Sequence, residues 1–349
     1  MSGFDLVVDR RNLTKAEIRP LDTDAALAEG EALFEIERFA LTANNITYGA
    51  VGDQIGYWRF FPAPEGLGRI PVWGFARVVR SNAAEAPVGL RLFGYWPMSS
   101  HAVARMARRG AGYVETSAHR AELPPTYNAY SAAEPSDQDD FRALLRPLFM
   151  TGFILDDQIC ETPPASLVLS SASSKTALSL AWLARRRGVK VIGLTSAAHV
   201  ERLGALNLYD ELAAYEDAGE VSAPAPAVYV DFAGRRAITA QVHAALGAAL
   251  VASIGVGVTH WDALGAPRVE VPGPAPSFFF APDRIRQRMK DWGADGLDQR
   301  FGEAMDAFVA DSPWLTLRHH RGAEALKAIY GDVVAGRVSP EDGHIVLPG

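Results

Sequence analysis

The sequence predicts an α/β protein in which a β-rich domain is combined with a doubly wound parallel sheet. Up to about residue 130, short apolar strand patterns are separated by Gly and Pro, which is typical of a barrel-like all-β domain. From about residue 150 to 270, strand patterns alternate with helical ones, which indicates a parallel sheet. The 349 residues are enough for two domains with separate cores.

The β-rich part is clearest at residues 32–41, and further strands are expected at 72–80 and 91–96. The acidic segment 134–140 marks the exit from this domain. The connection at residues 57–64 has an unusual aromatic content: Tyr57, Trp58, Phe60 and Phe61. In the first strand, strict alternation puts Leu33, Glu35 and Glu37 on one face and Phe34, Ile36 and Arg38 on the other.

The most informative segment is residues 166–184. An apolar run at 167–169 predicts a buried strand, the small residues 170–174 predict a tight turn, and a helical pattern follows. A second buried strand is expected at 190–194, so the segment has the order of the first half of a dinucleotide-binding unit. In such units the phosphates of the cofactor lie on the helix N-terminus after the first strand.

Serines replace the glycines of the usual G-x-G-x-x-G fingerprint in this turn. Serine hydroxyls and the Lys175 ammonium group can donate hydrogen bonds to phosphate. Two other interpretations stay open. The turn could be an ordinary one with a serine N-cap, or a degenerate P-loop ending in Lys175-Thr176 that lacks both glycines. The expected phosphate-binding residues are Ser171, Ser173, Ser174, Lys175 and Thr176.

The end of the second strand favours NADP over NAD. An NAD site normally places an acidic side chain here for the ribose hydroxyls. This strand instead ends in Thr195-Ser196, followed by His199 and Arg202. Hydroxyls and a cation suit a 2′-phosphate. The alternative is a plain helix N-cap at Ser196 with a solvated arginine.

The rest of the chain completes the pattern. Further strands are expected at 227–231 and 249–254, with helices at 177–187, 199–205 and 237–246. The C-terminal part predicts helices at 282–292, 298–308 and 324–331, and a last strand at 344–347.

Composition excludes several classes of function. A net charge of −7 gives no support for nucleic-acid binding. The single cysteine, Cys160, cannot form an internal disulfide or a multi-cysteine zinc site. No signal peptide or membrane-spanning stretch is evident, so we expect a cytoplasmic protein without a membrane partner.

Five segments in order resemble the medium-chain dehydrogenase/reductase superfamily, specifically its zinc-free quinone and enoyl reductase branch. The serine-for-glycine changes in the turn at residues 170–176 fit a divergent bacterial subfamily. The resemblance implies a GroES-like β-barrel domain at 1–135 and 275–349, and a Rossmann domain at 136–274. The five segments are the Asn-containing loop 41–48, the serine turn 170–176, and segments 206–215, 228–234 and 343–347.

The resemblance implies NADP(H) as cofactor and a homodimer as the assembly. Phe232 and Gly234 after one strand, and Gly255 at the end of the next, would line the nicotinamide side together with Phe279. Packing in the core is an equally open interpretation for Phe279.

The expected reaction is zinc-independent hydride transfer to an activated C=C or a quinone-like acceptor, with a small apolar or aromatic substrate. The resemblance implies a tyrosine acid, for which Tyr57 is the first candidate and Tyr48 and Tyr95 are alternatives. Asn45, in the Asn-containing loop, is the third expected catalytic residue. A lid or core role for the tyrosines stays open. So does a non-catalytic, redox-sensing protein that binds a dinucleotide on a reductase scaffold.

Overall fold

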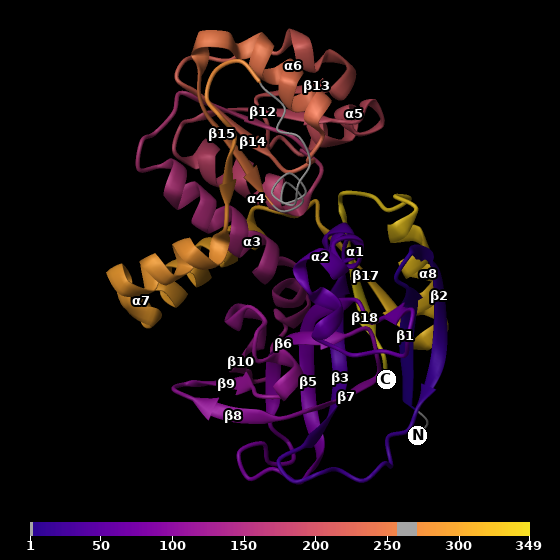
Figure 1. The fold of residues 1–349 in the computed structure, drawn as a ribbon. Helices are drawn as coiled ribbons and strands as arrows, with labels where there is room; N and C mark the ends of the chain where they lie inside the picture. The colour runs from indigo at the N-terminus through magenta and orange to yellow at the C-terminus, as the bar shows by residue number, and fades with distance from the viewer. Residues whose placement is uncertain (1–2, 257–270) are drawn as a thin grey trace. The chain divides into compact units, whose positions relative to one another are not determined.

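The computed structural model describes residues 3–256 and 271–349. The chain forms two compact units, Met1–Arg146 with Leu315–Gly349, and Pro147–Trp314 (Figure 1). These boundaries differ from the expected ones at 136 and 275, because the helices at the boundaries are divided between the two units differently than expected. Helix α3 (Asp139–Ile159) contains the first boundary. Helix α7 (Ala281–Ala310) belongs to the second unit.

Aromatic packing explains the position of α7. The Phe149 ring of α3 lies 5.9 Å from Phe301 and 5.2 Å from Phe308, measured between ring centroids. The return of the chain to the first unit therefore begins at Leu315. The two helices expected at 282–292 and 298–308 form one element with a kink at Gly293, whose φ is 74°.

The first unit is built from two mainly antiparallel sheets. The small sheet has the order β2-β1-β4, and the large one has the order β17-β18-β3-β5-β6-β10-β9-β8, with β7 also paired to β3. The strands of the small sheet are β1 (Gly3–Asp9), β2 (Asn12–Leu21) and β4 (Leu67–Gly68). Those of the large sheet are β3 (Ala32–Leu41), β5 (Pro71–Ser81), β6 (Arg91–Pro97), β7 (His101–Ala104), β8 (Met106–Arg109), β9 (Gly112–Glu115), β10 (Ala129–Ala132), β17 (Thr316–Arg321) and β18 (Asp342–Leu347).

The C-terminal return completes this unit. The last strand, β18, pairs antiparallel with β3, with Val346 opposite Phe39 (Figure 1). Helix α8 (Gly322–Val334) contacts β2 and buries Leu326 and Tyr330 in the same core. Segments from both ends of the sequence therefore form one hydrophobic core, as the GroES-like resemblance implies.

Strict alternation fails in β3. The pairing of β3 with β5 shifts register between Ile36 and Arg38, and both Ile36 and Phe39 are buried. The close approach needs a glycine on the partner strand. A Cβ at Gly74 would lie only 2.1 Å from the Arg38 carbonyl oxygen. A bulge of this kind cannot be seen in a period-two pattern.

The second unit is a six-stranded parallel sheet of order β13-β12-β11-β14-β15-β16. Numbered within the unit, this order is 3-2-1-4-5-6, which is the doubly wound Rossmann topology. The fold class expected from the sequence is therefore confirmed. The strands are β11 (Ser166–Leu169), β12 (Lys190–Thr195), β13 (Glu211–Ala214), β14 (Ala227–Asp231), β15 (Leu250–Val256) and β16 (Ser277–Phe279).

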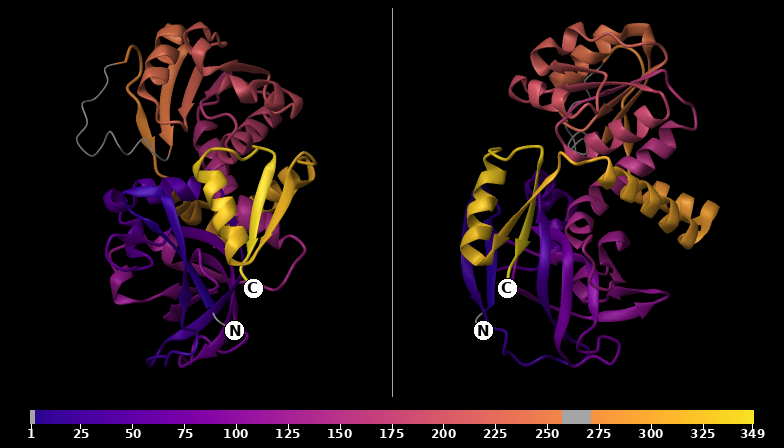
Figure 2. Two further views of the ribbon diagram at one scale, coloured as in Figure 1. Left: turned by 90° about the vertical axis from the view of Figure 1, so that its right-hand side faces the viewer. Right: turned by 180° about the vertical axis from the view of Figure 1, so that it is seen from behind.

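Helices cover both faces of this sheet (Figure 2). They include α4 (Lys175–Arg186), α5 (Ala197–Ala205) and α6 (Arg236–Leu246). Strands β11 and β14 are neighbours although their crossovers run in opposite directions along the sheet, so the switch point of the topology lies between them. Among the described helices, none has the length and apolar character that a membrane crossing requires.

Candidate functional site

The serine turn after β11 is held by internal hydrogen bonds. Ser171 has a left-handed backbone with φ of 50°, and its N–H donates to the Tyr215 hydroxyl over 2.9 Å. The Ala172 N–H donates to the Leu194 carbonyl oxygen over 3.0 Å. Only a small residue fits opposite Ala172, because a Cβ at Gly193 would lie 2.8 Å from the Ala172 Cβ. A turn without glycines is thus accommodated by a strained serine and a glycine on the neighbouring strand.

Helix α4 begins directly at this turn. Ser174 is its N-cap and accepts a hydrogen bond from the Ala177 N–H over 3.3 Å. Lys175 and Thr176 occupy the first turn, and the partly exposed Ser173 precedes the cap. The first N–H groups of a helix carry partial positive charge and have no partner within the helix. All five predicted phosphate-binding residues therefore surround one helix N-terminus suited to an anion.

The predicted 2′-phosphate residues lie at the end of β12. Thr195 is buried as the last strand residue, and Ser196 is the N-cap residue of α5. The Ser196 hydroxyl lies 3.3 Å from Nδ1 of His199. Arg202 is exposed one turn further along α5. The structure thus places the hydroxyl of Ser196 and the imidazole of His199 together at the start of α5, whereas Arg202 lies in the last turn of this helix.

The switch point is tied together by Asp231, a residue without an expected role in the site. Its Oδ1 accepts hydrogen bonds from the Ser170 hydroxyl at 2.6 Å and from the N–H groups of Ala233 and Gly234 at 3.0 and 3.1 Å. The Ser170 hydroxyl oxygen in turn accepts the N–H of Phe232 at 2.9 Å. This buried network fixes the carboxyl ends of β11 and β14 relative to each other.

Two further residues at this edge were missed by sequence analysis. Tyr215 begins the 3-10 turn η4 (Tyr215–Glu220) after β13, and the Arg235 guanidinium group lies 4.9 Å from its ring centroid. Tyr215 stands at the last position of the quoted segment 206–215, so its place in that motif was the available signal. Arg235 follows the strand motif 228–234, and nothing in the pattern singled it out.

The remaining cofactor candidates end the next two strands. Gly255 in β15 pairs with Phe278 in β16, and Val256 pairs with Phe279. Phe279 is buried, whereas Phe278 and Phe280 are largely exposed. Apart from Arg202, in the last turn of α5, the predicted cofactor residues lie at or just beyond the carboxyl ends of strands in one parallel sheet, where ligands of such sheets bind.

In the first unit, the predicted catalytic tyrosines belong to an aromatic cluster separate from the main core. Its buried members come from helix α1 (Ala43–Ala50), from the short segment that includes α2 (Gly52–Ile55) and η1 (Tyr57–Arg59), and from β6. The rings of Tyr48 and Tyr57 are 4.7 Å apart between centroids. The Tyr95 ring lies 4.8 Å from that of Tyr127. We refer to Tyr48, Tyr57, Phe60, Tyr95 and Tyr127, with the contacting Trp73, as the tyrosine cluster.

The hydroxyl groups of the tyrosine cluster differ in their partners. Tyr57 Oη lies 3.0 Å from Tyr127 Oη, and the Asn44 amide donates to Tyr48 Oη over 2.8 Å. The buried hydroxyl of Tyr95 has no hydrogen-bond partner among the described residues. Burial raises the pKa of Tyr48 and of Tyr57 well above the ordinary value. These phenols are therefore neutral proton donors at physiological pH.

Asn45 uses its whole amide to hold the backbone. Its Oδ1 accepts the Thr42 N–H over 2.8 Å, and its Nδ2 donates to the Pro71 carbonyl oxygen over 3.0 Å. This arrangement caps α1 and ties it to β5. The amide is thus engaged in positioning the helix that carries Tyr48.

A buried arginine, Arg120, holds the backbone of Phe60 in the tyrosine cluster. Arg120 donates through Nε to the Phe60 carbonyl oxygen over 3.0 Å and pairs with Glu115 at 3.2 Å. A second nitrogen donates to the Tyr130 hydroxyl over 3.1 Å. Because Arg120 is itself paired, it fixes the aromatic connection without leaving an uncompensated charge.

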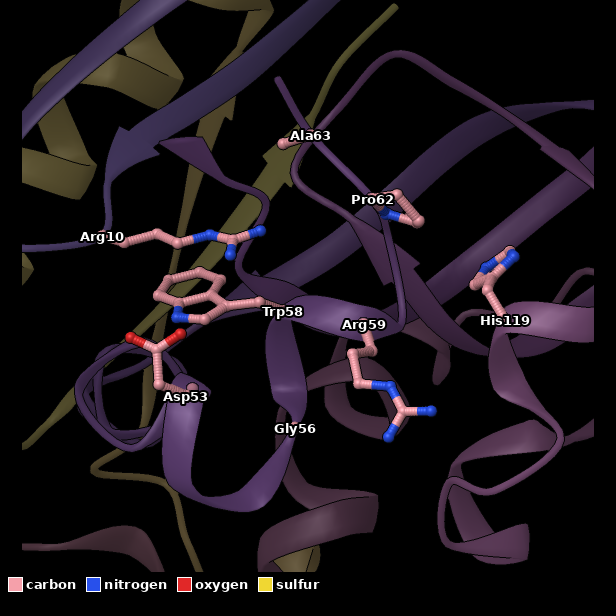
Figure 3. Close-up of a pocket in the computed structure, with 9 residues that line it drawn as sticks. Arg10, Asp53, Gly56, Trp58, Arg59, Pro62, Ala63 and His119 are labelled. Carbon is pink, nitrogen blue, oxygen red and sulfur yellow. The ribbon is translucent and has the colours of Figure 1, made fainter. Parts of the chain in front are cut away.

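A surface pocket of about 410 Å³ is lined in part by Trp58, Arg59 and Pro62 of the aromatic connection at residues 57–64 (Figure 3). Figure 3 shows Arg10 and Asp53 on opposite sides of the Trp58 indole. Trp58 is held tightly, since a Cβ at Gly52 would lie 2.3 Å from its ring. None of the predicted catalytic residues lines this pocket. Within residues 3–256 and 271–349, no group of three or more His, Cys, Asp and Glu side chains could hold a metal ion.

Comparison with protein families gives one match that covers most of the chain. A family model described as "Protein of unknown function (DUF2855)" matches residues 39–339. A search of curated proteins finds no match.

Comparison with solved structures confirms the fold. CurA from Vibrio vulnificus, solved in complex with NADPH, is similar with a TM-score of 0.64 at 14% identity, over 99% of each chain. A protein from Mesorhizobium loti assigned as an NADPH:quinone reductase has a TM-score of 0.65 at 13% identity, over 99% of this chain and 98% of that one. The mitochondrial 2-enoyl thioester reductase heterodimer from Candida tropicalis gives 0.58 at 11% identity, over 99% and 100%. The chain therefore has the same fold as these solved structures.

Proposed function

The chain belongs to the DUF2855 family, and we propose that it is a zinc-independent NADP(H)-dependent oxidoreductase that reduces an activated C=C or a quinone-like acceptor. One observation carries the proposal. A serine turn and a helix N-terminus lie at the switch point of a 3-2-1-4-5-6 parallel sheet, with Ser196 and His199 at the end of the next strand. The NADPH-containing structure of CurA, which shares the fold, supports the choice of cofactor.

The diphosphate would be held by the first turn of α4, with Lys175 supplying charge and the Ser173 and Thr176 hydroxyls supplying donors. The hydroxyl oxygen of Tyr215 already accepts the Ser171 N–H, so its own proton remains to be donated. The Ser171 N–H is thus used within the protein, and the Tyr215 hydroxyl would donate to the cofactor in its place. Arg235, stacked on that tyrosine, adds a second cation.

Selectivity for NADP(H) would come from Ser196 and His199 at the start of α5, with the exposed Arg202 in its last turn. None of these three residues is acidic, and a hydroxyl and cations suit a 2′-phosphate. On the nicotinamide side, Phe232, Gly234, Gly255 and Phe279 would form the wall. When bound, the reduced cofactor supplies a hydride, and the protein supplies orientation and a proton.

The proton would come from Tyr57, with Tyr48 as the alternative donor. Both phenols are neutral, and both lie in one apolar cluster suited to a small apolar or aromatic acceptor. Asn45 would act as a positioning residue, because its amide is committed to the cap of α1.

A non-catalytic, dinucleotide-sensing protein is the second candidate function. The tight ring packing of the tyrosine cluster favours it, because Tyr57 is only 8% exposed and an acceptor must displace aromatic contacts to reach its hydroxyl. A protein that binds NADPH but reduces no enone or quinone would fit this candidate.

We further propose a homodimer formed through the sheet edge. Strand β16 is the terminal strand of the parallel sheet, and the apolar side chains of Val251, Phe278, Phe280 and Met289 are exposed on or beside β15, β16 and the start of α7. An exposed edge strand with apolar side chains is a surface that another chain can cover. Sedimentation of the wild type and of Phe280→Asp tests this, since the variant should sediment as a monomer.

The activity is tested by following NADPH oxidation with panels of enones and quinones. We expect turnover with at least one acceptor, a reduction of kcat of about a hundredfold in Tyr57→Phe, and unchanged NADPH affinity. Full activity in Tyr57→Phe together with loss in Tyr48→Phe would reassign the acid to Tyr48. No turnover by the wild-type protein would leave the sensing function.

A further inference from the structure

Tyr57 and Tyr127 form a hydroxyl pair within the tyrosine cluster. Their oxygens lie 3.0 Å apart although the residues are 70 positions apart in the sequence. Tyr127 belongs to a 3-10 turn, η3 (Pro125–Asn128), that follows the buried Leu123. This turn had no expected role, because its sequence indicates only a proline-containing connection.

The Tyr127 ring is held on several sides. Its centroid lies 4.8 Å from that of Tyr95, 5.5 Å from Phe60 and 5.6 Å from Tyr57. A ring fixed in this way cannot swing its hydroxyl away from Tyr57 without losing these contacts. Tyr127 is also partly exposed, whereas Tyr57 is buried. One member of the pair is therefore buried and the other is partly exposed.

We propose that Tyr127 is the positioning residue of the acid: it donates its hydrogen bond to the Tyr57 oxygen, stabilises the phenolate formed there, and returns a proton to it from solvent. The inference rests on the proposed function, which makes Tyr57 the proton donor. Tyr57 can give its own proton to an acceptor only if that proton is not used within the pair. Tyr127 must therefore be the donor between the two oxygens.

The effect of the bond on the two phenols agrees with this direction. Burial raises the pKa of Tyr57, and the hydrogen bond from Tyr127 lowers it. Burial also raises the pKa of Tyr127, and there the same bond raises the pKa further. The other ionisable groups facing the pair are Tyr48 of α1, Tyr95 of β6, and Arg120 with its partner Glu115 behind Phe60.

The proposed step conserves protons and electrons. A bound reduced nicotinamide would supply the hydride for one carbon of the acceptor C=C, and Tyr57 would supply the proton for the other, so that the acceptor would be reduced and the nicotinamide oxidised. The Tyr57 O–H bond breaks, and its electron pair stays on the phenolate oxygen. Tyr127 then passes its proton to Tyr57 and takes one from water, which restores both hydroxyls.

The first test measures acidity at position 57 without any turnover. A trifluorinated tyrosine at position 57 has a phenol acidic enough to titrate while the protein is folded, and fluorine NMR follows it. In Tyr127→Phe, which keeps the ring and removes one oxygen, the midpoint should rise by about one to two pH units, the size of one hydrogen bond to a charged group. Tyr95→Phe is the matched control, because the hydroxyl it removes makes no hydrogen bond among the described residues.

An unshifted midpoint in Tyr127→Phe, or an equal shift in Tyr95→Phe, would overturn the inference. The second test uses turnover of an enone with NADPH. Tyr127→Phe should lower kcat about tenfold with unchanged KM and unchanged NADPH affinity. Absence of NADPH binding would remove the proposed function and leave the titration result standing. Normal turnover with an unshifted titration would remove the role of Tyr127 alone.

Discussion

Replacing Ser171 by glycine should stabilise the protein, although most substitutions at a buried turn do the opposite. Ser171 has φ of 50°, a left-handed conformation that costs a residue with a Cβ about 1–2 kcal/mol. Glycine adopts this conformation without strain. However, glycine also gives the unfolded chain more conformational freedom, which lowers the free energy of unfolding by about 0.4–1 kcal/mol. The backbone N–H that donates to Tyr215 is retained in the variant. The net expectation is an increase in the free energy of unfolding of about 0.5–1 kcal/mol.

Urea denaturation measures this difference, with Ser173→Gly as the matched control. Ser173 lies in the same turn but does not have a positive φ, so glycine there should only destabilise, by about 0.4–1 kcal/mol. Equal destabilisation by both substitutions would refute the reasoning. It would mean that the serine hydroxyl at position 171 contributes more than the backbone strain costs.

Three further predictions follow from the site. Ser170→Ala should lower the free energy of unfolding by about 2–3 kcal/mol in urea denaturation, because the hydroxyl donates to Asp231 and accepts two backbone N–H groups. Arg235→Ala should weaken NADPH and NADH equally, by about tenfold in calorimetric titration, since the proposed contact is to a phosphate shared by both. Burial raises the pKa of Tyr48, Tyr57 and Tyr95, so the folded state favours their protonated forms. The contribution of these tyrosines to the free energy of unfolding should be constant below about pH 10, the pKa of an unfolded tyrosine, and should fall as the pH rises further. Urea denaturation on both sides of that pH measures the change.

The order of elements could be predicted from the sequence because each long element carries its own periodicity. The strand at 32–41 and the segment 166–184 were found where expected. Strands β13 and β16 were missed, since four and three residues at the edges of a sheet leave too short a pattern. The position of α7 depends on the contacts of Phe149 with Phe301 and Phe308, which no local pattern encodes.

The candidate site was predictable in its outline but not in its contacts. The serine turn stood out because its residue types depart from a known fingerprint. That Ser171 is left-handed and donates to Tyr215 depends on strands far apart in sequence. Likewise, Asn45 belongs to a quoted motif, but only the structure shows that its amide is used in a cap. The pair of Tyr57 and Tyr127 required the tertiary fold.

Titration calorimetry with NADPH and NADH tests the central claim most directly. The account predicts that NADPH binds more tightly than NADH, that Arg202→Ala removes this preference, and that Lys175→Ala weakens both cofactors. Binding of neither nucleotide, or tighter binding of NADH, would contradict it.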